Sequence, residues 1–142
     1  MTLPQINKWT HGTQVTASHG HFAFFGAFAM LVIAAMYYMV PRLRGMERYD
    51  RKRSMWAFWL MCVGMLGMVL AFTVAGVVQV YLTRILGMDF MAVRTQYVSF
   101  WIFWVWACGL VIFLPGVVAF LWDFLAGKPP AGEAVRAAPV AF

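Results

Sequence analysis

Three long stretches without a charged residue constrain this chain more than any other feature of its sequence. They are residues 9–41, 54–83 and 95–122, which hold 33, 30 and 28 residues. An α-helix needs about 20 consecutive apolar residues to cross the hydrocarbon core of a bilayer, and each stretch exceeds that length. The sequence therefore predicts an all-α integral membrane protein with three transmembrane helices.

Composition excludes an ordinary soluble domain. Hydrophobic residues make up 63% of the chain and charged residues only 11%, whereas a soluble domain carries about 25% charged residues. Six of the 11 basic residues lie in residues 41–54, and the rule that short basic loops stay inside places this loop in the cytoplasm. The net charge of +6 comes mostly from this loop, so it does not indicate a nucleic-acid partner.

Charge and hydropathy together predict an order of segments along the chain. The predicted segments are an extracytoplasmic N-terminal segment (1–11), a transmembrane helix (12–39), a basic cytoplasmic loop (40–54), a second transmembrane helix (55–83), an extracytoplasmic loop (84–96), a third transmembrane helix (97–122) and a cytoplasmic tail (123–142) with a disordered end. No helix precedes Met1 to carry an outward N-terminus across the membrane. One explanation is that the chain is the C-terminal piece of a longer polytopic protein.

Two histidines inside the first predicted span are the strongest functional signal. Ionisable groups are costly within a membrane and usually serve a function there. His19 and His21 are two residues apart, so an α-helix sends their side chains about 200° apart. They cannot readily share one metal, but each can offer a ring nitrogen to a separate partner. His11 lies near the outer boundary of the span and is interpreted as an interfacial residue.

The surroundings of the pair favour haem over zinc. No Cys, Asp or Glu lies nearby to complete a tetrahedral site, whereas imidazole is a common axial ligand of haem iron. Gly20 separates the histidines and costs about 1 kcal/mol of helix propensity relative to Ala, which close approach of a bulky group would explain. The alternative is that both histidines only donate hydrogen bonds to neighbouring helices. The aromatic and small residues around the pair are Ala17, Phe22, Ala23, Phe24, Phe25, Gly26, Ala27 and Phe28.

The segment from Trp9 to Gly26, which reads WTHGTQVTASHGHFAFFG, resembles the tenth helix of the haem–copper oxidase superfamily. It is most similar to the large, haem-carrying subunit of cytochrome-c-dependent nitric oxide reductases. The resemblance continues through residues 38–45 (YMVPRLRG) and 75–80 (AGVVQV) and weakens in the third span. It implies that the chain corresponds to helices ten to twelve of a twelve-helix fold.

The resemblance gives each histidine a separate role. It implies that His19 is the proximal ligand of a high-spin haem, and therefore the catalytic residue of this chain through that haem. It implies that His21 is an axial ligand of a low-spin haem that passes electrons on. His11 and Asn7 match a region near the haem propionates. The implied cofactors are two b-type haems, with a non-haem iron in the complete subunit.

The implied activity is reduction of two NO molecules to N2O and water in a bacterial inner membrane. The implied partners are the remaining helices of the catalytic subunit, a membrane-anchored cytochrome c subunit and the lipid bilayer. A cytochrome cbb3-type terminal oxidase shares the His-x-His helix and is an alternative. A haem-free structural or truncated membrane protein is an alternative of another class.

The chain departs from the family pattern in what it lacks. The family's non-haem iron uses three histidines and a glutamate from earlier helices, and its low-spin haem uses a second histidine from an early helix. Only one histidine remains here beyond the pair, and no carboxylate lies in a predicted span. The sequence therefore predicts a chain that cannot assemble the active site alone, either as a fragment or as one part of a split subunit.

Overall fold

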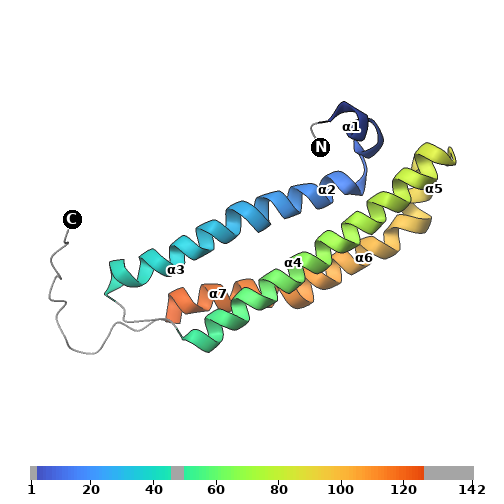
Figure 1. Cartoon of the computed structure of the whole chain (residues 1–142). Helices are drawn as coiled ribbons and strands as arrows, with labels where there is room; N and C mark the ends of the chain where they lie inside the picture. The colour runs from blue at the N-terminus through green and yellow to red at the C-terminus, as the bar shows by residue number, and fades with distance from the viewer. Residues whose placement is uncertain (1–2, 46–49, 127–142) are drawn as a thin grey trace.

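The computed structural model of the protein describes residues 3–45 and 50–126, which form three long helices side by side (Figure 1). Each long helix is built from α-helical segments, some of them separated by wider, π-type turns labelled η. In chain order the segments are α1 (Pro4–Thr10), α2 (Gln14–His21), η1 (Phe22–Ala29), α3 (Met30–Arg44), α4 (Arg51–Val80), η2 (Tyr81–Ile85), α5 (Phe90–Val93), η3 (Arg94–Val98), α6 (Ser99–Ala107), η4 (Cys108–Phe113) and α7 (Leu114–Ala126).

All three long helices are long and apolar enough to cross a membrane. They run over Gln14–Arg44, Arg51–Ile85 and Phe90–Leu125, which are 31, 35 and 36 residues long. The predicted fold class, an all-helical chain with three membrane spans, is confirmed. Which side of the membrane each turn faces stays a prediction from the positions of Lys and Arg.

The long helices extend into both of the loops predicted at 40–54 and 84–96. Gly45, at φ +62°, ends α3, and the Asp50 carboxylate accepts the first free N–H groups of α4. Asp89 caps the third long helix in the same way, by accepting the N–H of Ala92 at 3.0 Å. Helices run past the end of the apolar stretch because the long side chain of an arginine reaches water from a helical position. Arg94, predicted in a loop, therefore lies in η3.

The start of the predicted cytoplasmic tail is helical. Residues 123–126 belong to α7, and Asp123 is 2% exposed. Asp123, one residue beyond the third predicted span, lies in the long helix Phe90–Leu125 and is paired inside the bundle, where burial of a charge is tolerated. The predicted disorder of the tail concerns residues 127–142, which lie outside the described residues.

Helix α4 packs closely against both other long helices because glycines remove side chains at the crossing points. A Cβ added at Gly76 would meet the backbone nitrogen and side chain of Val15 in α2. A Cβ added at Gly64 would lie 2.6 Å from the backbone nitrogen of Phe113 in η4. Small residues at helix crossings are typical of membrane helix packing. Gly64 and Gly76 therefore allow α4 to approach both neighbouring helices closely.

Different segments form the two ends of the bundle (Figure 1). We call the end formed by Arg44, Arg51, Lys52, Arg53 and Asp123 the basic end. We call the opposite end, where α2 meets the far part of α4, the histidine end. A buried cluster of apolar residues supports each: Ala57, Met61, Phe120 and Phe124 at the basic end, and Ala75, Val93 and Val98 at the histidine end.

Candidate functional site

Hydrogen bonds tie the first turns of α2 to α4 and thereby fix where the two histidines lie. The backbone N–H of Gln14 donates to Oε1 of Gln79 at 3.1 Å, and Gln79 is 1% exposed. One turn further on, the Ser18 hydroxyl lies 3.0 Å from the carbonyl of Val69 and 2.7 Å from the hydroxyl of Thr73. These contacts hold α2 in one rotational setting against α4.

Because Ser18 faces α4, the two histidines lie in different surroundings. Each residue advances an α-helix by about 100°. Because Ser18 faces α4, His19 leaves about 100° to one side of it and His21 about 60° to the other. Both side chains are exposed within this chain. His21 therefore borders α4, whereas His19 turns away from it.

His21 is oriented by two contacts. Its Nδ1 lies 2.8 Å from the carbonyl oxygen of Ala17, one turn back along α2. Its ring lies 4.9 Å from the ring of Phe72 on α4, at an interplanar angle of 39°. A carbonyl can only accept a hydrogen bond, so this arrangement places the ring proton on Nδ1. The lone pair on Nε2 is then available to a metal, which is the usual arrangement of a histidine ligand with a backbone partner.

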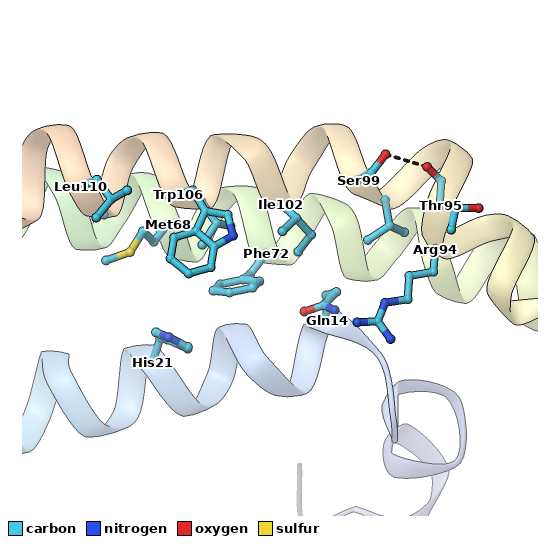
Figure 2. A pocket seen from close by; sticks show the side chains of 13 residues that line it. Gln14, His21, Met68, Phe72, Arg94, Thr95, Ser99, Ile102, Trp106 and Leu110 are labelled. Atoms are coloured by element: carbon cyan, nitrogen blue, oxygen red, sulfur yellow. Dashed lines mark hydrogen bonds between the residues drawn. The ribbon is translucent and has the colours of Figure 1, made fainter.

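His21 borders a cavity between α2, α4 and the third long helix (Figure 2). The cavity has a volume of about 670 Å³. Its walls beside His21 are aromatic and aliphatic, with Phe72 and Trp106 on the facing helices. Its polar residues lie at the end where α2 begins: Gln14, Arg94, Thr95 and Ser99.

The residues present fit an axial ligand of a haem better than a metal ion bound by protein groups alone. In the ranges 3–45 and 50–126, no three His, Cys, Asp or Glu side chains come together as metal ligands. Cofactor cavities are typically about 300–1,000 Å³ and mostly apolar with a few polar groups, as this one is. A haem needs only an imidazole from this helix, and the Nε2 of His21 is free to supply one.

His19 and Gly20 face space that the described part of the chain does not fill. His19 makes no hydrogen bond or ring contact with any described residue. Apart from its chain neighbours and the backbone of its own helical turns, a Cβ added at Gly20 would have no described atom within 4 Å. Packing within this chain therefore does not explain the glycine, and its place between the histidines leaves the helix backbone open to a neighbouring group.

The structure does not bring His11 and Asn7 to the histidine pair. The backbone N–H of His11 donates to the carbonyl of Asn7 at 2.9 Å and so ends α1. Gly12, at φ +76°, then turns the chain into α2. Both side chains are exposed, and neither contacts His19 or His21 among the described residues. Their proposed place near haem propionates stays a prediction.

A buried polar cluster at the basic end was not predicted. The Asp123 carboxylate lies 3.0 Å from Nε of Arg53. It also accepts hydrogen bonds from the Tyr37 hydroxyl, at 3.0 Å, and from the Ser54 hydroxyl, at 2.9 Å. The cluster joins α3, α4 and α7. The sequence signal for this cluster was the position of Asp123 directly after an apolar helical run. A charge at the edge of such a run also fits the first residue of a tail, which is how Asp123 was interpreted.

Comparison with known proteins gives matches along the whole chain. Residues 1–111 match the family described as Cytochrome C and Quinol oxidase polypeptide I. A nitric oxide reductase subunit of Stutzerimonas stutzeri is 42% identical over 149 aligned positions, which cover 99% of this chain and 30% of the relative. Cytochrome c oxidase subunit 1 of Rhodobacter capsulatus is 27% identical over 147 positions, covering 98% of this chain and 28% of the relative. A cytochrome c oxidase subunit 1 homolog of Agrobacterium tumefaciens (strain T37) is 32% identical over 85 positions, covering 59% and 16%.

The three long apolar helices show the class of this protein, which is a multi-pass membrane protein. The family match over most of its length then identifies it more closely. The chain belongs to the family of Cytochrome C and Quinol oxidase polypeptide I. It spans less than a third of the length of these relatives. The predicted similarity to nitric oxide reductase large subunits is confirmed.

Proposed function

We propose that this chain is the C-terminal part of the catalytic subunit of a nitric oxide reductase, an oxidoreductase that converts two NO molecules to N2O and water. The 42% identity to the nitric oxide reductase subunit of Stutzerimonas stutzeri, over 99% of this chain, supports this activity. The observation that carries the proposal is the pair His19 and His21, which leave one helix in two directions with no partner that closes a metal site within the described chain.

In this proposal each histidine holds a different haem. His21 would hold the iron of a low-spin haem beside Phe72, and His19 would hold the iron of a high-spin haem on the other side of α2. When bound, the haems supply electron transfer and iron coordination of the substrate. One helix that carries both ligands keeps the two haems close, which suits transfer of electrons between them.

The chain's own residues orient these ligands and exclude water. The Ala17 carbonyl fixes the proton of His21 on Nδ1 and sets the ring plane, as outer-shell partners of metal-bound histidines do. Phe72 and Trp106 form apolar walls of the cavity. Apolar walls control solvent access to a haem and so help to set its potential.

The remaining ligands come from partners in this proposal. The other helices of the catalytic subunit would supply a second histidine for the low-spin haem. They would also supply the three histidines and the glutamate that hold the non-haem iron. A membrane-anchored cytochrome c subunit delivers electrons. The large exposed apolar side chains on η1, such as Phe24 at 75% and Phe28 at 66% exposed, offer a surface that those helices can cover.

Substrate consumption by the purified complex tests the proposal against an oxidase. With a reduced electron donor, the complex should consume NO faster than O2. Removing an outer-shell partner of a metal ligand typically lowers activity by roughly 10–100-fold. His19→Ala should lower NO consumption by more than this, because in the proposal His19 is itself a ligand. Val32→Ala is the control, because this side chain is 57% exposed on the same long helix, three turns from His21.

A complex that consumes O2 and leaves NO untouched would favour the cytochrome cbb3-type oxidase instead. The 32% identity to a cytochrome c oxidase subunit 1 homolog supports that alternative. The alignment with this homolog covers only 59% of this chain. A purified complex without haem would support the third alternative, a haem-free membrane protein, and would contradict both enzyme assignments.

A further inference from the structure

Three consecutive cations begin α4, and they have different surroundings. The Arg53 guanidinium is neutralised inside the bundle by the buried Asp123 and lies 3.5 Å from the Asp50 carboxylate. Arg51 and Lys52 are exposed, and neither forms an ion pair with any described carboxylate. Two positive charges at the basic end therefore remain without a counter-ion from the described part of the chain.

The two free cations border a groove with aromatic walls. The groove has a volume of about 600 Å³, and its lining consists of Arg51, Lys52, Met55, Trp56 and Trp59. Trp56 and Trp59 are 67% and 55% exposed. Neither indole N–H donates a hydrogen bond to a described residue. The groove thus offers cations, indole rings and free N–H donors on one side of α4.

The spacing along α4 matches the layers of a membrane surface. A helix rises about 1.5 Å per residue, so Trp59 lies about 12 Å further along the helix than Arg51. The headgroup and interfacial layer on each side of a bilayer is about 5–8 Å thick. When Arg51 and Lys52 lie at the headgroups, Trp56 lies near the boundary with the hydrocarbon and Trp59 just below it, which is where tryptophans concentrate.

We propose that this groove is a binding site for the headgroup of an anionic phospholipid. The phosphate binds between the Arg51 guanidinium and the Lys52 ammonium group, which both recognise phosphate oxygens. Trp56 contacts the glycerol region, and Met55 and Trp59 pack against the first part of the acyl chains. Charge complementarity selects an anionic lipid over a zwitterionic one, whose own cation would face the two basic side chains. The site is separate from the histidines and does not depend on the enzymatic assignment.

Tryptophan quenching by brominated lipids tests the proposal on the complete purified complex. The complex is placed in phosphatidylcholine vesicles that contain either brominated phosphatidylglycerol or brominated phosphatidylcholine. The quenching that disappears in Trp56→Phe/Trp59→Phe is due to these two indoles. The ratio of their quenching by brominated phosphatidylglycerol and brominated phosphatidylcholine gives the lipid preference of the groove. We expect a preference for phosphatidylglycerol of roughly five- to twenty-five-fold, because each cation near a membrane surface contributes about a factor of five.

Charge variants separate the site from a general effect of charge. Arg51→Gln/Lys52→Gln should bring the preference to about one, and Arg51→Lys/Lys52→Arg should keep it. The matched control Lys8→Gln/Arg84→Gln removes two exposed cations at the histidine end and should also keep it. Equal loss in both charge-removing variants, or a preference that survives Arg51→Gln/Lys52→Gln, would overturn the proposal.

Two further outcomes would also overturn it. If neither brominated lipid quenches Trp56 and Trp59, another protein segment covers the groove. If inorganic phosphate abolishes the preference at the ionic strength of a chloride buffer, a soluble anion is the ligand. We expect both lipids to quench these indoles and phosphate to leave the ratio unchanged.

Discussion

Asp123 holds three helices together with one carboxylate. It pairs with Arg53 and accepts hydrogen bonds from Tyr37 and Ser54, so a single side chain on α7 contacts both α3 and α4. A buried carboxylate is costly unless its oxygens are satisfied in this way. The cluster therefore fixes how the three helices meet at the basic end.

Asp123→Asn should destabilise the protein by about 2 kcal/mol. The substitution leaves Arg53 without its buried partner, and loss of one partner from a buried pair costs about 3–5 kcal/mol; we expect less because the Arg53 side chain is 34% exposed. The thermal midpoint of the complex in detergent measures the effect. Asp89→Asn is the matched control, because Asn caps a helix as well as Asp does. Equal midpoints for the two variants would show that the cluster does not hold the bundle.

Among single residues, the sequence predicted the histidine pair but not its neighbours. A rare ionisable residue in an apolar run is visible without a structure, and helical geometry separates His19 from His21. The Phe72 ring beside His21 was not predictable, because its position depends on how α2 is rotated against α4. The contact with the Ala17 carbonyl lies within α2 and depends on the rotamer of His21, which the sequence does not give. Asp123 was assigned to the cytoplasmic tail, because its partner Arg53 lies 70 positions away in the sequence and the pairing is not visible without a structure.

At the scale of whole helices, the caps at helix ends and the glycines at helix crossings matter most. Asp50 caps the start of α4. The backbone N–H of Lys52 holds the pKa of the Asp50 carboxyl below its ordinary value of 3.8. The backbone N–H and the guanidinium of Arg53 lower this pKa further. A lowered pKa in the folded state means that the carboxylate form contributes stability. That contribution is present above pH 3.8 and is lost as the pH falls through the lowered pKa.

Asp50→Asn should therefore reduce the acid sensitivity of the protein. Asn still caps the helix but does not titrate. Between about pH 5 and pH 3 the thermal midpoint of the unmodified complex should fall more steeply than that of Asp50→Asn, because only the former loses a carboxylate. Parallel curves over this range would contradict the role of the Asp50 carboxylate at the start of α4.

Gly76→Ala should separate α2 from α4. The added Cβ would meet the backbone of Val15, which cannot rotate away as a side chain can. Overpacking of this kind costs about 1–3 kcal/mol, and we expect loss of both haems because α2 carries their ligands. Haem content per complex and the thermal midpoint measure the effect. A variant with normal haem content would mean that α2 and α4 do not cross at Gly76.

Gly20→Ala makes the opposite test on the same long helix. No described atom lies near the added Cβ, and Ala raises helix propensity by about 1 kcal/mol, so the three-helix fold should be kept. We still expect less haem, since the proposed arrangement has a bulky group close to this backbone. Full haem content in Gly20→Ala, measured as the pyridine haemochrome, would show that no such group approaches.

For the long helices, the sequence predicted three spans because each apolar stretch exceeds the thickness of a bilayer. The predicted ends were misplaced because charge was taken to mark loops. Helix caps were the better signal: Gly45 and Asp50 bound the first turn, and Gly87 and Asp89 lie in the second. The wide η1 segment after His21 has no marker in the sequence, because its aromatic and small residues fit an ordinary α-helix equally well.

The molecule as a whole is a bundle whose exposed surface is mostly apolar. Within the described chain, α4 is the helix that both others contact, and the first long helix presents its other face to its surroundings. The family relatives are more than three times as long as this chain. We therefore expect other helices of the catalytic subunit to cover the exposed faces of this bundle, including the face of α2 that carries His19.

The visible spectrum of the purified complex tests most directly that α2 holds two haems on two faces. His21→Ala should remove the low-spin band and leave the high-spin band, whereas His19→Ala should perturb the high-spin band and leave the low-spin band. Val32→Ala should change neither. If both histidine variants lost the same band, the two histidines would serve one haem, and the division of α2 into two ligand faces would be wrong.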